Sequence, residues 1–127
     1  MSTVLLIDDD PAMRDVLFEL LTLDGYEVTL AEDGIQGLEQ YRNKLPDVVI
    51  TDLEMPNLNG VELIEALTTE FTDVPILVIT GSTDMSLIEE ALDMDANRIL
   101  HKPFEVDMLL DAVGLLTGRI LPTEDEK

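Results

Sequence analysis

The hydrophobic positions of the chain fall into short runs that alternate with longer, periodically spaced groups. Several of the short runs are almost continuously apolar, as in "VLLI" at 4–7 and "PILVIT" at 75–80. Such runs are typical of strands that are buried on both faces of a parallel sheet. We therefore predict five strands, at residues 3–7, 27–31, 47–51, 75–80 and 98–101.

Between these runs, apolar residues recur every three or four positions, which is the period of an α-helix. The first predicted helix has Asp10 as its N-cap and Pro11 in its first turn, and Gly25 follows its end. The second, at about 34–44, has the weakest pattern. The apolar positions of the five helices are Met13, Leu17, Leu20 and Leu21; Ile35, Leu38 and Tyr41; Gly60, Ile64, Leu67 and Phe71; Met85, Ile88 and Leu92; and Val106, Leu109, Leu110 and Val113.

The resulting order is five consecutive βα units with short connections. This order predicts a doubly wound α/β fold, with right-handed crossovers and helices on both faces of a parallel sheet. No internal repeat or linker interrupts it. We expect one domain over residues 1–118, followed at 119–127 by a polar tail or the start of a linker.

Composition narrows the function classes. The chain of 127 residues has no cysteine, which excludes disulfides and thiolate metal sites. Its 28 acidic and 7 basic residues give a formal charge of −21, so direct binding to nucleic acid is disfavoured. The sequence has neither an apolar run long enough for a membrane span nor a secretory signal pattern, and we expect a cytoplasmic protein.

Polar residues with complementary chemistry follow four of the predicted strands. Asp8 and Asp9 follow the first strand, Asp52 the third, Thr80 ends the fourth and Lys102 follows the fifth. In open α/β sheets, ligands bind beyond the carboxyl ends of the strands. Grouped carboxylates suit Mg²⁺, while a lysine and a hydroxyl suit a phosphate. Together they predict a phosphoryl-transfer site in which one carboxylate is the nucleophile.

Each of these residues also has a simpler explanation when it is taken alone. Asp8 and Asp9, with Asp10, could form a charged loop before a helix, Asp52 could be a turn residue, and Lys102 could be a surface charge. Their joint occurrence at four strand ends favours a shared site.

The same residues carry a resemblance to a known family. The acidic pair Asp8-Asp9, the segment "DLEMPNLNG" from Asp52, the "VIT" that ends at Thr80 and the "KPF" at 102–104 occur in the order typical of receiver domains of two-component response regulators. The likeness runs from about residue 4 to about residue 117. It implies a flavodoxin-like sheet with strand order 2-1-3-4-5.

The resemblance implies a role for each acidic residue. Asp52 corresponds to the phosphoacceptor, which takes a phosphoryl group from a phosphohistidine of a sensor histidine kinase or a phosphotransfer protein. Asp9, Asp52 and the backbone carbonyl of Glu54 would hold Mg²⁺, and Asp8 would bind it through water.

It also implies roles for residues around the phosphate. Thr80 would contact a phosphoryl oxygen, and Lys102 would pair with the phosphate. Glu54 and Ser82 occupy positions that tune the lifetime of the acyl phosphate. A cis peptide bond is common before the proline that corresponds to Pro103.

The chain departs from the family pattern at two places. Ile99 stands where many receivers have a tyrosine or phenylalanine that moves together with the threonine at the Thr80 position. Ile99 has no ring to turn, so a different relay of the signal is expected. Asp95 stands where a glycine is frequent.

Three other functions agree with part of the sequence pattern. In a haloacid-dehalogenase-type phosphatase, Asp8 would be the nucleophile and Asp10 the acid/base, but Pro11 follows directly and no late acidic pair follows Lys102. A nonphosphorylated module with the same fold would not need all five site residues. A dinucleotide site is disfavoured because the first βα turn, "DDDPAM", contains no glycine.

We therefore expect a phosphoacceptor switch and not an enzyme, although it would assist its own phosphorylation and dephosphorylation. Its partners would be a kinase or phosphotransfer protein and a downstream protein target, and a phosphorylation-dependent dimer stays open. The sequence does not distinguish a protein that acts alone from a part of a longer one.

Overall fold

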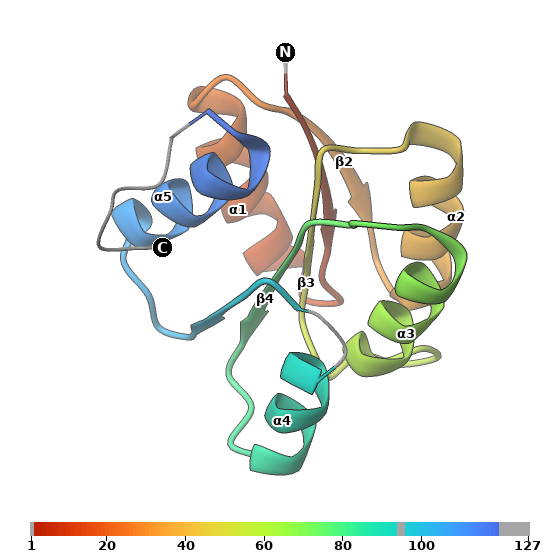
Figure 1. Ribbon diagram of the computed structural model, residues 1–127. Helices are drawn as coiled ribbons and strands as arrows, with labels where there is room; N and C mark the ends of the chain where they lie inside the picture. Colours follow the sequence, from red (N-terminus) through yellow and green to blue (C-terminus); the bar gives the residue numbers. More distant parts are fainter. Residues whose placement is uncertain (1, 94–95, 120–127) are drawn as a thin grey trace, which may run out of the picture.

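The computed structural model describes residues 2–93 and 96–119, and it has the predicted alternation of strands and helices (Figure 1). The elements are β1 (Thr3–Ile7), α1 (Pro11–Leu23), β2 (Glu27–Ala31), α2 (Gly34–Lys44), β3 (Val48–Thr51), α3 (Gly60–Glu70), β4 (Ile76–Thr80), α4 (Met85–Asp93), β5 (Arg98–His101) and α5 (Val106–Thr117).

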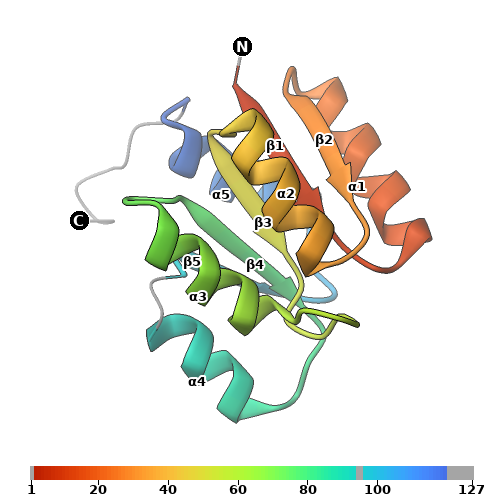
Figure 2. The same ribbon diagram turned by 90° about the vertical axis from the view of Figure 1, so that its right-hand side faces the viewer.

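The five strands form one parallel sheet in the order β2-β1-β3-β4-β5, which confirms the predicted order. Helices α1 and α5 cover one face, and α2, α3 and α4 cover the other (Figures 1 and 2). Because all strands run in the same direction, their carboxyl ends meet at one edge. The order of the strands reverses between β1 and β3, and the residues that follow these two strands lie next to each other.

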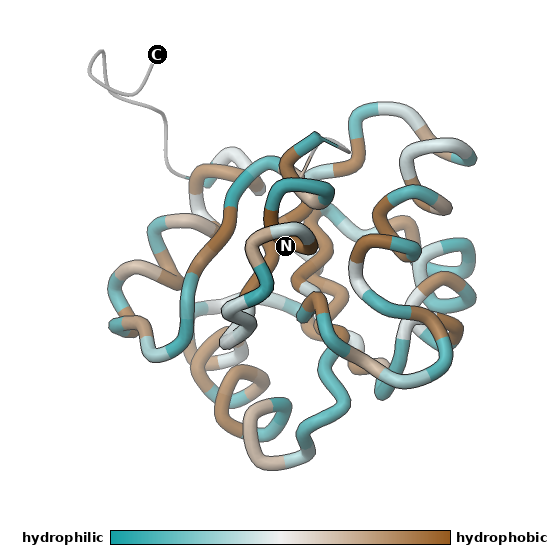
Figure 3. Tube along the Cα trace, turned by 90° about the horizontal axis from the view of Figure 1, so that it is seen from below, coloured by the Kyte–Doolittle hydropathy of each residue, from teal (hydrophilic) through white to brown (hydrophobic). Residues whose placement is uncertain are grey.

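Each strand contributes alternate side chains to two separate cores. Leu5 and Ile7 of β1 pack on the side of α2, α3 and α4, whereas Val4 and Leu6 pack on the side of α1 and α5. Hydrophobic residues therefore follow the strands through the middle of the molecule, and hydrophilic residues are frequent on the connections (Figure 3). Burial on both faces explains the almost continuous apolar runs of the sequence.

The predicted boundaries agree closely with the structure. Strands β3 and β4 each begin one residue later than predicted, and at β4 the extra residue is Pro75, which has no N–H to donate to a ladder. Asp10 caps α1 as predicted, since its side chain accepts a hydrogen bond from Ala12 N at 3.0 Å. Asp95 and the tail from Ile120 onward lie outside the described residues.

No helix within residues 2–93 and 96–119 is long and apolar enough to cross a membrane.

Gly60 brings the start of α3 against the end of β3. Its N–H donates to the carbonyl of Leu53 at 2.9 Å, and a Cβ atom at this position would overlap the backbone of Asp52 and Leu53. The side chain of Asn59 completes the turn by capping α3, together with Glu62. The absence of a side chain at position 60 therefore allows the close packing that holds the backbone of Asp52, the residue that follows β3.

We predict that Gly60→Ala lowers the free energy of unfolding by about 1–3 kcal/mol, because the added methyl group must displace backbone atoms. Urea unfolding measures this change. Gly81→Ala is the matched control, because its Cβ would meet nothing closer than the Lys102 side chain at 3.8 Å. Equal losses in the two variants would contradict the role given to Gly60.

Candidate metal and phosphoryl site

Three carboxylates meet where β1 and β3 end. One oxygen from each of Asp8, Asp9 and Asp52 lies within 4.8 Å of the others. Asp8 is 3% exposed, Asp52 is partly buried and Asp9 is exposed. The site therefore has a buried floor at Asp8 and opens to solvent at Asp9.

Lys102 faces these acids from the end of β5. Its Nζ donates a hydrogen bond to Asp52 Oδ2 at 3.0 Å and lies 3.5 Å from Asp8 Oδ2. The backbone N–H of Lys102 donates to the Thr80 carbonyl at 2.8 Å, and the following bond to Pro103 is cis, as the resemblance implied. One ammonium group thus lies between two carboxylates from different strands.

The Asp52 carboxylate has a fixed orientation. Its Oδ1 accepts hydrogen bonds from the N–H groups of Leu53, at 2.6 Å, and Glu54, at 3.4 Å, while Oδ2 accepts from Lys102. The Asp52 side chain is 12% exposed, so it remains accessible from outside. Both oxygens of Asp52 thus accept hydrogen bonds, and a group bonded to this carboxylate would lie next to these same donors.

Thr80 is fully buried at the end of β4, and its hydroxyl accepts a hydrogen bond from Ser82 N at 3.0 Å. Ser82 Oγ in turn donates to Glu54 Oε1 at 2.8 Å. The structure thus brings the two predicted tuning residues into direct contact. Among the described residues, the Thr80 hydroxyl forms no hydrogen bond with Asp52.

The surroundings change the acid–base behaviour of two groups. Burial raises the pKa of the Asp8 carboxyl, against the lowering effects of the Asp10 N–H and the Lys102 charge. Burial alone would lower the pKa of Lys102, but its hydrogen bond to Asp52 and the charges of Asp52 and Asp8 outweigh burial and raise it. Lys102 therefore stays an ammonium ion throughout the physiological range.

The donor set fits a divalent cation. When all groups are ionised, three carboxylates and one ammonium leave two negative charges uncompensated, which equals the charge of one Mg²⁺ ion. Carboxylate oxygens are also hard ligands of the kind that Mg²⁺ prefers. Asp8, Asp9 and Asp52 could hold such an ion at the edge of the sheet.

The comparison with protein families decides the classification. The family model of the response regulator receiver domain matches residues 4–114. The chain belongs to this family. The response regulator MprA of Mycobacterium sp. (strain KMS) is 39% identical over 121 residues, which cover 95% of this chain and 53% of that protein. The chain thus spans about half the length of the curated relatives that it matches.

Solved receiver structures have the same fold. A receiver domain protein from Clostridium thermocellum superposes with a TM-score of 0.88 at 28% identity, covering 94% of this chain and 96% of the other. The chemotaxis protein CheY4 of Vibrio cholerae superposes with a TM-score of 0.83 at 31% identity, covering 91% and 98%. Domains of this family are signalling modules.

Sequence reasoning missed two contacts beside the acidic site of this receiver domain. Arg14 Nη1 donates to the backbone carbonyl of Asp8 at 2.8 Å, and Asn57 Nδ2 donates to Asp33 Oδ2 at 2.9 Å. Asn57 has a φ of +69°, in the left-handed region that asparagine tolerates. Neither contact follows a periodic pattern, so residue spacing could not have indicated them.

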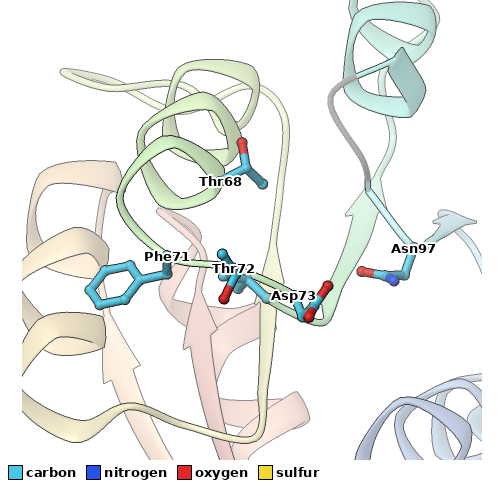
Figure 4. A pocket seen from close by; sticks show the side chains of 6 residues that line it. Thr68, Phe71, Thr72, Asp73 and Asn97 are labelled. Carbon is cyan, nitrogen blue, oxygen red and sulfur yellow. The ribbon is translucent and has the colours of Figure 1, made fainter.

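A separate open pocket of about 500 Å³ lies at the opposite end of the sheet, where α3 ends and β4 begins (Figure 4). Its lining includes Asp73 and Asn97, and none of the described residues that line it is basic. Asn97 accepts a hydrogen bond from Ile76 N at 2.8 Å, so its amide supports the sheet. This pocket lacks the charge that a phosphoryl group needs and is not part of the site.

We predict that Asp8→Asn raises the urea midpoint of the receiver domain at neutral pH in the presence of a chelator. Because folding raises the pKa of Asp8, its contribution to stability is present at acid pH and is lost as the pH rises through the folded-state pKa. The asparagine retains an acceptor for the Asp10 N–H and carries no charge.

The gain should therefore shrink as the pH is lowered. Asp15→Asn on the exposed part of α1 removes the same charge without relieving a buried group, and it serves as the control. Equal midpoints for wild type and Asp8→Asn at neutral pH would contradict this assignment.

Proposed function

We propose that this receiver domain accepts a phosphoryl group on Asp52 and thereby changes its binding to a partner protein. The observation that carries the proposal is the position of the Asp52 carboxylate, partly exposed and held between Lys102 Nζ and two backbone N–H groups, within reach of two further acids. A nucleophile that is already oriented loses less entropy when its reaction partner arrives.

In the proposed reaction, an Asp52 oxygen forms a bond to phosphorus while the bond from phosphorus to the donor histidine nitrogen breaks. The departing imidazole nitrogen takes a proton from solvent. Bound Mg²⁺ would supply positive charge to the phosphoryl oxygens and to the carboxylates around them. Asp9, Asp52 and the Glu54 carbonyl would hold this ion directly, and Asp8 would hold it through water.

The remaining residues act on the phosphorylated form. Lys102 would pair with the phosphate as a point charge, and the Thr80 hydroxyl would donate to one of its oxygens. Glu54 and Ser82 would tune the rate of hydrolysis. Ile99 is partly buried and packs against the core on the side of α2, α3 and α4, so it can repack when Thr80 moves, without the ring that many receivers use.

The partners are proposed from the family and from the charge of the surface. A sensor histidine kinase or a phosphotransfer protein would supply the phosphoryl group, and a protein target would distinguish the two states of the receiver. The formal charge of −21 favours partners with basic surfaces over nucleic acid. Whether phosphorylation also promotes a dimer belongs to the same proposal.

The test is intact-mass measurement after incubation with phosphoramidate and Mg²⁺. We expect one added phosphoryl group on the wild type and none on Asp52→Asn, because the amide cannot act as the nucleophile. An excess of chelator should abolish the addition. Labelling that survives the chelator would contradict the role of the cation.

The same samples separate this function from a phosphatase of the haloacid-dehalogenase type. That reaction would use Asp8 as nucleophile, so turnover of a small phosphomonoester would be lost in Asp8→Asn and kept in Asp52→Asn. The burial of Asp8 and its hydrogen bond from Asp10 N weigh against its acting as an accessible nucleophile.

A further inference from the structure

The loop between β1 and α1 carries two of the three acids, and one side chain of α1 reaches back to it. Arg14 Nη1 donates to the carbonyl of Asp8 at 2.8 Å, and the Arg14 side chain is half-buried. The Asp8 N–H pairs with β2 through the Ala31 carbonyl, at 3.2 Å. The Arg14 guanidinium therefore gives the carbonyl at the end of β1 a partner from the helix that follows.

Two other hydrogen bonds hold the same loop. Asp10 N donates to Asp8 Oδ1 at 3.0 Å, and Ala12 N donates to Asp10 Oδ1 at 3.0 Å. Among residues 2–93 and 96–119, no group donates a hydrogen bond to the carboxylate of Asp9. The direction of Asp9 is thus set by the loop backbone, which is held at Asp8 and at Asp10.

Arg14 also lines an open pocket of about 340 Å³ beside the acids, together with Asp9 and Asp33. Its charge there has an effect opposite to that of its hydrogen bond. A guanidinium near a cation site repels the cation, so by Coulomb's law alone the removal of Arg14 would tighten cation binding. The two effects can therefore be separated by their sign.

We propose that Arg14 is a positioning residue of the cation site. By holding the Asp8 carbonyl it fixes the loop backbone that directs Asp9 toward Asp8 and Asp52, and this ordering outweighs its electrostatic repulsion of Mg²⁺. The inference rests on the proposed function, because it concerns the same site. Residues that orient metal ligands typically change metal affinity about 10- to 100-fold when they are mutated.

The experiment measures Mg²⁺ affinity without phosphorylation. Amide chemical shifts of the full chain are followed by NMR during a Mg²⁺ titration at constant ionic strength. We expect Arg14→Met to bind Mg²⁺ about tenfold more weakly than the wild type. Arg14→Gln also removes the charge and is too short to reach the Asp8 carbonyl, but it keeps a polar side chain on α1. We expect the same weakening in this variant, which replaces Arg14→Met in the test if Arg14→Met does not fold.

Arg42→Met is the matched control. Arg42 forms an exposed ion pair with Glu70, at 2.8 Å, on α2 and α3, and among the described residues it has no hydrogen bond or ion pair with the acidic site. Its removal changes the net charge by the same amount, so its Mg²⁺ affinity should equal or slightly exceed that of the wild type.

The outcomes separate the possibilities. Mg²⁺ affinity in Arg14→Met and Arg14→Gln that equals or exceeds the wild-type value would overturn the proposal, even if both variants unfold at a lower temperature. Weaker affinity in these variants, with Arg42→Met unchanged, supports it. If the wild type itself neither binds Mg²⁺ nor takes a phosphoryl group on Asp52, the proposed function fails as well.

Discussion

Repulsion among the carboxylates of Asp8, Asp9 and Asp52 is the constraint on which the rest of this structure depends. One oxygen of each carboxylate lies within 4.8 Å of the others, so the ionised groups repel one another. Burial adds a desolvation cost at Asp8. Lys102 compensates only part of this charge. In the proposed function, the uncompensated negative charge would attract a divalent cation, and with that cation bound the site would also accept a phosphoryl group. The unfavourable arrangement of the acids is therefore what gives the site its chemistry.

Such an arrangement persists only on a rigid support, and the parallel sheet provides one. Both faces of the central strands are covered, so β1 and β3 cannot move apart without exposing one of two cores. The loops beyond the strands are short and are held by hydrogen bonds. Gly60 allows α3 to approach the end of β3, and the N–H groups of Leu53 and Glu54 orient Asp52. Strain from like charges is thus balanced by packing that lies elsewhere in the domain.

The strands and most of the site were predictable because both follow from simple patterns. Continuous apolar runs mark strands buried on two faces, and parallel direction brings Asp8, Asp52 and Lys102 to one edge. Helix α2 gave a weak signal because glycine forms part of its buried face: Gly34 and Gly37 are buried beside Tyr41, and glycine adds little to a hydropathy pattern. The hydrogen bonds of Arg14 and Ser82 depend on side-chain conformations, which have no counterpart in residue spacing.

The contacts of Thr80 show how chemistry at Asp52 would be felt at a distance. Its hydroxyl accepts from Ser82 N, and Ser82 Oγ joins Glu54 across the loops that follow β3 and β4. In the proposed function, a group that drew the Thr80 hydroxyl toward Asp52 would pull on this connection, so the loop before α4 would respond to the site without an aromatic ring at position 99. A ligand shifts a conformational equilibrium only through contacts that differ between the two states. In the proposed switch, the hydrogen bond from Ser82 N to the Thr80 hydroxyl would be such a contact, because it joins the end of β4 to the loop that leads to α4.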